Sequence, residues 1–160
     1  MLQRRFFLAL WMLASMCGSA LADAATHRFD FVSVKNYQSD CYKDKKGKRQ
    51  CSPFCMVTGK LTNLTDTTAP DVLLEIFVKN PLNPREDGED SRFTFQFDDV
   101  AIGKSLKTGS DIPFSVCQKL EPTRITVSCG SSLRSGLCGF VNVDVAANKT
   151  LRLPRRRISN

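Results

Sequence analysis

The sequence predicts an all-β protein, a seven-stranded sandwich of the immunoglobulin or fibronectin type III kind that is held together by disulfides. Apolar and polar residues alternate in short runs, turn residues separate the runs, and no segment after residue 22 keeps a helical period for three turns. Seven such runs in about 120 residues fit this sandwich class. A small barrel remains an alternative, because counting strands does not distinguish one closed sheet from two stacked sheets.

The alternation places one strand in each of seven segments. These are residues 27–35, 55–62, 72–79, 92–98, 112–118, 123–129 and 137–145. The clearest is 92–98, where Phe93, Phe95 and Phe97 share one face and polar residues occupy the other. We therefore expect one β-sandwich domain from residue 26 to residue 146, followed by a basic C-terminal tail at 147–160.

Residues 1–22 have the features of a secretory signal peptide. Arg4 and Arg5 precede an apolar stretch about half as long as a transmembrane helix, and small residues near Ala22 form a cleavage site. We expect a secreted protein, or alternatively a periplasmic one, with no stable membrane insertion. The mature chain would begin at Asp23 or Ala25. Loss of the two leader arginines from 23 Lys and Arg leaves 21 against 16 Asp and Glu, a charge of +5.

Cleavage would also remove Cys17 and leave six cysteines. They are Cys41, Cys51, Cys55, Cys117, Cys129 and Cys138. An even number in an exported chain predicts three disulfides, and the spacings oppose zinc or a thioredoxin-like redox pair. The arrangement we favour joins Cys41 to Cys51, Cys55 to Cys117 and Cys129 to Cys138, although other pairings exist. Alternation places Cys55 inward but Cys117 outward, so that pairing needs a bulge or a phase change near Pro113.

Charged residues concentrate in the connections. The segment from Asn36 to Phe54 is expected to be a long loop closed by Cys41–Cys51, and loops of that length tend to be functional or disordered. If consecutive strands are antiparallel, this basic loop, the acidic connection near residue 86 and the arginine tail lie at one end. The candidate binding residues are Tyr42, Lys43, Lys45, Lys46, Lys48, Arg49, Arg85, Glu86 and Asp87. The alternative is that they are ordinary solvated loops that keep the protein soluble.

Known catalytic motifs are missing from the sequence. It contains no Gly-rich phosphate loop and no nucleophile elbow, and its one histidine, His27, is expected to be exposed or at an edge. We therefore expect no enzyme activity and no cofactor. Four positive charges lie in the last nine residues, so the nearly neutral body argues against a nucleic-acid partner. Calcium binding is a minority alternative because acidic residues surround Gly88. They are Glu86, Asp87, Glu89, Asp90 and Asp98.

Two segments carry a resemblance to known proteins. Residues 27–36 and the pattern Val57-x-Gly59-x-Leu61-x-Asn63 are similar to small exported bacterial immunoglobulin-like domains. Together with the disulfide-closed basic loop, they make residues 26–146 resemble the secreted interleukin-receptor mimic proteins of pathogenic Gram-negative bacteria. The resemblance implies a fibronectin type III-like sandwich, a homodimer that exchanges structural elements, and virulence-associated binding of host cytokines or cytokine receptors. The mature chain lacks tryptophan, so mimicry would depend on shape and loop chemistry.

Three functions remain open from the sequence. The first is an exported module that binds a host immune protein. The second is an inhibitor of an envelope or host enzyme, in which a rigid disulfide-closed loop enters an active site. The third is an assembly component of the cell envelope. Pull-down from host serum and immune-cell lysate, compared with envelope lysate, would separate the first from the others.

Overall fold

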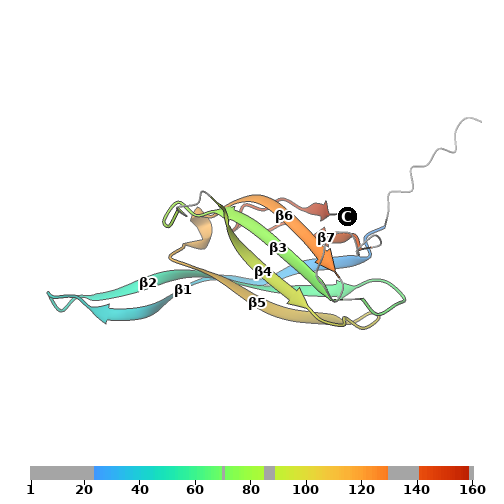
Figure 1. The fold of residues 1–160 in the computed structure, drawn as a ribbon, viewed down its shortest axis with the longest axis horizontal. Coiled ribbons are helices and arrows are strands. Elements are labelled where there is room, and N and C mark those ends of the chain that lie inside the picture. The colour runs from blue at the N-terminus through green and yellow to red at the C-terminus, as the bar shows by residue number, and fades with distance from the viewer. Residues whose placement is uncertain (1–23, 70, 85–88, 130–140, 159–160) are drawn as a thin grey trace, which may run out of the picture.

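The computed structural model describes residues 24–69, 71–84, 89–129 and 141–158, and it confirms the all-β class with two sheets (Figure 1). The strands are β1 (His27–Lys43), β2 (Arg49–Asn63), β3 (Val72–Lys79), β4 (Ser91–Phe97), β5 (Ser105–Pro113), β6 (Glu121–Cys129), β7 (Val143–Val145) and β8 (Arg156–Ile158). The strand order is β5-β2-β1-β7-β8 in the first sheet and β4-β3-β6 in the second. The expected signal peptide lies outside the described residues. Within the described ranges, no helix is long and apolar enough to cross a bilayer.

The core lies between the inner faces of the two sheets. The alternating apolar residues of β2, β3, β4 and β6 are buried as the sequence predicts. The ring of Phe29 lies 5.1 Å from that of Phe95 and 6.1 Å from that of Phe97, measured between centroids, so aromatic contacts join the sheets. Gly59 makes room for this cluster, because a Cβ at that position would lie 2.3 Å from Cζ of Phe29.

The prediction of a long loop between Asn36 and Phe54 is wrong, because most of that segment is strand. β1 and β2 continue as an antiparallel hairpin to the pair Lys43 and Arg49. β5 pairs with β2 no further out than Phe54, and β7 pairs with β1 only from His27 to Phe29. We call residues 38–53 the arm. It projects beyond the sandwich at the left of Figure 1. Cross-strand hydrogen bonds form this ribbon without the alternation of apolar residues that marks a half-buried strand.

The connections between strands gather at two opposite ends of the sandwich. The β2–β3 and β4–β5 connections meet where Ala69 N donates to Val100 O at 3.0 Å. The β3–β4 and β5–β6 connections meet at the base of the arm, where the Asn80 side chain donates to Phe114 O at 3.2 Å and Ser115 N donates to Pro53 O at 3.0 Å. This is the distribution expected for consecutive antiparallel strands.

The fifth strand does not lie where the sequence analysis placed it. It occupies Ser105–Pro113 instead of 112–118, and a short 3-10 helix, η1 (Cys117–Lys119), follows. Cys117 lies in η1 and is buried there. Strand alternation therefore does not decide which way its side chain points, and its bond to Cys55 needs no bulge near Pro113. The predicted Cys41–Cys51 and Cys55–Cys117 disulfides are confirmed. Cys129 is also disulfide-bonded, whereas its expected partner Cys138 lies outside the described residues.

The C-terminal segment belongs to the folded body. In the described part of the expected 137–145 strand, β7 runs parallel to β1, towards the arm. The chain then turns, buries Leu151 and Leu153, and returns as β8, antiparallel to β7. Residues 147–158 of the expected tail therefore add a strand and two core side chains. Because β8 runs away from the arm, Arg156 and Arg157 are aligned along β7 instead of extending the charged arm.

Candidate functional site

The arm is the element of the structure that stands apart from the core. None of residues 38–53 is buried, whereas the parts of β1 and β2 that lie in the sandwich bury alternate residues. A two-stranded hairpin by itself is marginally stable in water. The Cys41–Cys51 disulfide joins the two strands and limits their separation. The arm is therefore a covalently closed projection with both faces accessible.

A tight turn organises the tip of the arm. Oδ1 of Asp44 accepts hydrogen bonds from Lys46 N and Lys48 N, each at 2.9 Å, and Gly47 has the positive φ of 73° that the turn requires. Backbone hydrogen bonds, that from Lys48 first, lower the pKa of the Asp44 carboxyl. This carboxylate is thus engaged with the backbone of the turn, and it forms no ion pair with the surrounding cations.

The five predicted cations gather on this turn. Lys43, Lys45, Lys46, Lys48 and Arg49 are all exposed. No ion pair involves any of them within the part of the chain that the structure describes. Tyr42 lies beside them with 64% of its surface exposed. The structure therefore brings together six of the nine predicted binding residues, whereas Arg85, Glu86 and Asp87 lie outside the described residues.

A polar hollow lies behind the tip. It has a volume of about 460 Å³ and is lined by Gln38, Arg49, Gln50 and the Cys41–Cys51 disulfide. Gln50 also donates a hydrogen bond to Asp44 at 3.4 Å, which connects the hollow to the turn. Amide and guanidinium groups can donate hydrogen bonds to a carboxylate of a partner. The chemistry of the arm tip thus suits an acidic surface.

The base of the arm is anchored by an aromatic pair and by buried polar contacts. The rings of Tyr37 and Phe54 stack with centroids 5.0 Å apart, and Tyr37 OH donates to Asp111 at 3.3 Å. Ser115 Oγ, which is buried, donates to Ile112 O at 2.7 Å and accepts from Cys55 N at 3.1 Å. These contacts fix the arm to β5 and to the segment before η1. Ser115 carries no motif that could have predicted this role.

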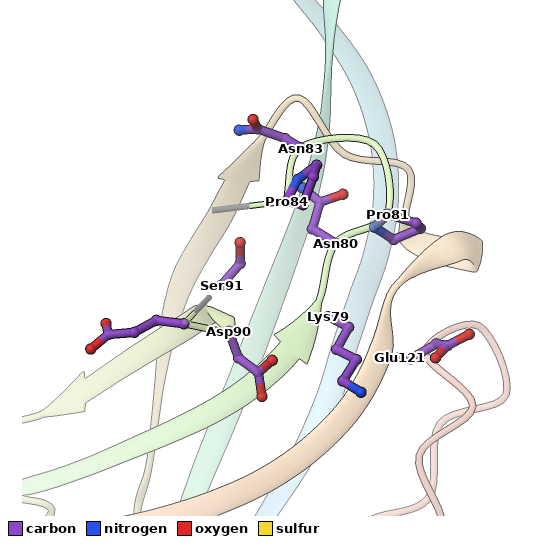
Figure 2. A pocket seen from close by; sticks show the side chains of 9 residues that line it. Lys79, Asn80, Pro81, Asn83, Pro84, Asp90, Ser91 and Glu121 are labelled. Atoms are coloured by element: carbon purple, nitrogen blue, oxygen red, sulfur yellow. The ribbon is translucent and has the colours of Figure 1, made fainter. Parts of the chain in front are cut away.

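A second hollow opens at the same end, where β3 ends and β4 and β6 begin (Figure 2). It measures about 350 Å³, and its lining includes Lys79, Asp90, Ser91 and Glu121. Asp90 accepts a hydrogen bond from Thr123. Hydrolase chemistry at Ser91 would need an activating base, and the only histidine of the chain lies at the start of β1. The described lining residues thus do not form a serine–histidine pair.

His27 lies inside the protein, which corrects the expectation of an exposed or edge histidine. Only 2% of its surface is accessible, because alternation along β1 places it on the same inward face as Phe29. Nδ1 lies 2.9 Å from Thr26 Oγ1, and Nε2 has no hydrogen-bond partner among the residues that the structure describes. Burial lowers the pKa of His27. The sequence contained a signal for this burial, because His27 lies two residues before the apolar Phe29 and therefore on the same face of the strand.

The metal hypothesis rests on residues that are only partly described. Glu86, Asp87 and Gly88 lie outside the described residues. Across the described ranges, no group of three or more His, Cys, Asp or Glu side chains could hold a metal ion. The structure therefore provides no described ligand set from which a calcium site could be argued.

Comparisons of the chain with protein-family models, with curated proteins and with solved structures found no match.

Proposed function

We propose that this chain is a secreted, non-enzymatic binding protein whose arm engages a protein partner. The observation that carries the proposal is the projecting ribbon of residues 38–53, which buries none of its side chains in the body. A ribbon of this kind adds little to the stability of the core, but it presents backbone edges, Tyr42 and a cationic turn to another molecule. Exposed sheet edges of this kind are established sites of strand addition in protein recognition.

The partner that we propose is a host cytokine or a cytokine receptor, so the protein would act in immune modulation and virulence. This assignment rests on the resemblance to interleukin-receptor mimics. The strand order supports a fibronectin type III-like sandwich, since β1, β2 and β5 share one sheet and β3, β4 and β6 share the other. One difference from the usual arrangement is that β7 pairs with β1, whereas the final strand of such sandwiches lies beside the sixth.

The cations of the tip would act mainly on the rate of association. Exposed charges attract an oppositely charged surface over about one Debye length, roughly 8 to 10 Å at physiological ionic strength. Lysine is depleted in the cores of protein interfaces, so these side chains suit the rim of a contact better than its centre. An acidic partner would be steered towards the arm, and the steering would weaken as salt is added.

A homodimer is part of the proposal. β1 is a 17-residue strand, and pairing with β2 continues along nearly its whole length. Exchange of this strand between two copies would preserve the same pairings in the dimer, so that it requires few new contacts. Light scattering at micromolar concentration checks this, and a monomer mass at every concentration would count against exchange.

An enzyme inhibitor is the second candidate function. The observation in its favour is the shape of the arm, a narrow ribbon that is closed near its tip by Cys41–Cys51. A rigid projection can enter a cleft with little loss of conformational freedom. An envelope assembly role is a third possibility, and capture of an envelope enzyme or an envelope scaffold, instead of a host protein, would favour one of these two functions.

Surface-based kinetics with matched charge variants test the main proposal. The probes are purified interleukins and interleukin-receptor ectodomains. The tip variant replaces Lys45, Lys46 and Lys48 by Gln, and the control replaces Lys104, Lys107 and Lys149, which are exposed on the body. We expect association about 10-fold slower for the tip variant at low salt, with a smaller difference at high salt and unchanged dissociation. Equal effects of the two variants would contradict steering by the arm.

A further inference from the structure

Phe114 adopts a backbone conformation that bulky residues avoid. Its φ is 51°, in the left-handed region, where a side chain with a Cβ is strained. Burial of the ring does not compensate this strain, since 49% of the residue is exposed. Strained residues persist when the surrounding structure enforces them, and they are concentrated at functional sites.

Contacts on both sides of Phe114 enforce this conformation. Its carbonyl accepts a hydrogen bond from Nδ2 of Asn80 at 3.2 Å, and Asn80 itself is only 6% exposed. The next residue, Ser115, is buried and bonded through its amide and hydroxyl to β2 and β5. Two residues later, Cys117 is joined to Cys55 on β2. The chain therefore holds an exposed phenyl ring at a fixed place beside the arm.

The same buried amide also positions a second exposed apolar residue. Oδ1 of Asn80 accepts a hydrogen bond from Leu82 N at 3.2 Å, and Leu82 is 45% exposed. Figure 2 shows Asn80 at the start of the turn that continues through Pro81, Asn83 and Pro84. One side chain thus connects the backbones of Leu82 and Phe114, which belong to two different loops at the base of the arm.

From this arrangement we infer that Phe114 and Leu82 are the apolar anchors of a docking surface at the base of the arm, for a protein whose apolar contact region is bordered by carboxylates. The inference rests on the proposed function and assigns its principal contacts. A few aromatic or aliphatic anchors dominate the affinity of most interfaces, and anchors held in position lose little freedom on binding.

The arm indicates the charge of this partner. Five exposed cations without ion pairs among the described residues project from the same end of the molecule as Phe114 and Leu82. A partner seated on the anchors would bring its border close to the arm, where carboxylates are attracted and cations are repelled. The tip would then set the rate of association, and the anchors would set the rate of dissociation.

Kinetics on the same interleukin and receptor panel test the anchors separately from the tip. We expect Phe114→Ala and Leu82→Ala each to accelerate dissociation by about 10-fold or more, with association changed less than about twofold. Ile102→Ala is the matched control, because Ile102 is 54% exposed at the opposite end, beside Val100. Dissociation that is unchanged in both anchor variants, or accelerated equally in the control, overturns the inference.

The strain gives a test that needs no partner. Phe114→Gly removes the Cβ that opposes a positive φ, so we expect the melting temperature of the isolated protein to rise by about 2 to 4 °C. A fall would mean that the ring supports the fold, and it would overturn the inference whatever the panel binds. If no panel protein binds while Phe114→Gly is stabilising, the cytokine assignment fails, whereas the strain at Phe114 from which the anchors are inferred is established.

Light scattering of Phe114→Ala and Leu82→Ala distinguishes the proposed partner from a second copy of the chain. We expect both variants to keep the mass of the wild-type protein. If wild type is a dimer and either variant is a monomer, the surface serves self-association, and its assignment to a different protein with an acidic border is overturned.

Discussion

Arg155 holds the C-terminal segment on the body through Asp144 of β7. The Arg155 guanidinium donates to both carboxylate oxygens of Asp144, from Nε at 2.9 Å and from Nη2. Hydrogen bonds from Arg155, followed by the charges of nearby arginines, lower the pKa of Asp144. Asp144 is buried, whereas the Arg155 side chain is largely exposed.

Arg155→Ala should destabilise the protein, because it leaves a buried carboxylate without its charged donor, although exposure of the arginine limits the loss. Arg156→Ala is the control, since Arg156 is the next residue along the chain and is an exposed cation. Urea unfolding at pH 7 measures both. The depressed pKa of Asp144 means that the pair stabilises the fold above the ordinary value of 3.8 and that this stabilisation is lost as pH falls through the lower folded value. Equal stability of the two variants would contradict this role.

His27 should make stability sensitive to a higher pH range. Burial lowers its pKa from 6.5, so the neutral ring is favoured in the folded protein. Its stabilising effect is complete above pH 6.5 and is lost as pH falls through the folded pKa, by about 1.4 kcal/mol for each unit between the folded and unfolded values. His27→Gln should remove this part of the pH dependence between pH 7.5 and 5. If the free energies of unfolding of wild type and variant change in parallel with pH over that range, His27 does not contribute to the pH dependence.

The two disulfides that join described cysteines should have separable effects. Cys41→Ser with Cys51→Ser should increase hydrogen exchange across residues 38–53 and leave β3 protected, because the arm buries no side chain. Cys55→Ser with Cys117→Ser should lower global stability by about 2 to 5 kcal/mol, since both sulfurs lie in the core. Hydrogen exchange with mass spectrometry and urea unfolding measure these effects. Loss of β3 protection in the arm variant would show that arm and body unfold together.

The sequence predicts the core better than the edges. Val72 and Leu74 share one face of β3, Phe93 and Phe95 alternate with polar residues along β4, and all four are buried as these spacings indicate. The arm lacks such a signal, because neither of its faces meets the core. Its pairing depends on contacts between residues far apart in sequence, such as Tyr37 with Phe54. Local alternation carries no information about such contacts.

The same limit explains the errors in β5 and at the C-terminus. β5 is an edge strand of the first sheet, and most of its residues are exposed, so its polar sequence resembles a loop. The arginines near residue 156 resemble a solvated tail, yet Asp144, Leu151 and Leu153 bring that segment onto the body. At the candidate site, the charge cluster and the Cys41–Cys51 closure were predictable. The strain at Phe114 was not, because it depends on Asn80 and Ser115 in three dimensions.

Gly59 allows the close contact between the two sheets at the ring of Phe29. A Cβ at Gly59 would lie 2.3 Å from Cζ of Phe29, a ring that is fully buried against Phe95. Gly59→Ala must therefore displace the ring or the backbone, and we expect a loss of about 1 to 3 kcal/mol in urea unfolding. Gly109→Ala is the control on neighbouring β5, where the nearest atom to a new Cβ is Val57 O at 3.9 Å. Replacing Phe29 by Leu in the Gly59→Ala background should cost less than the same replacement in wild type, because the smaller side chain relieves the overlap. Additive losses would mean that Gly59 is required for a reason other than the ring of Phe29.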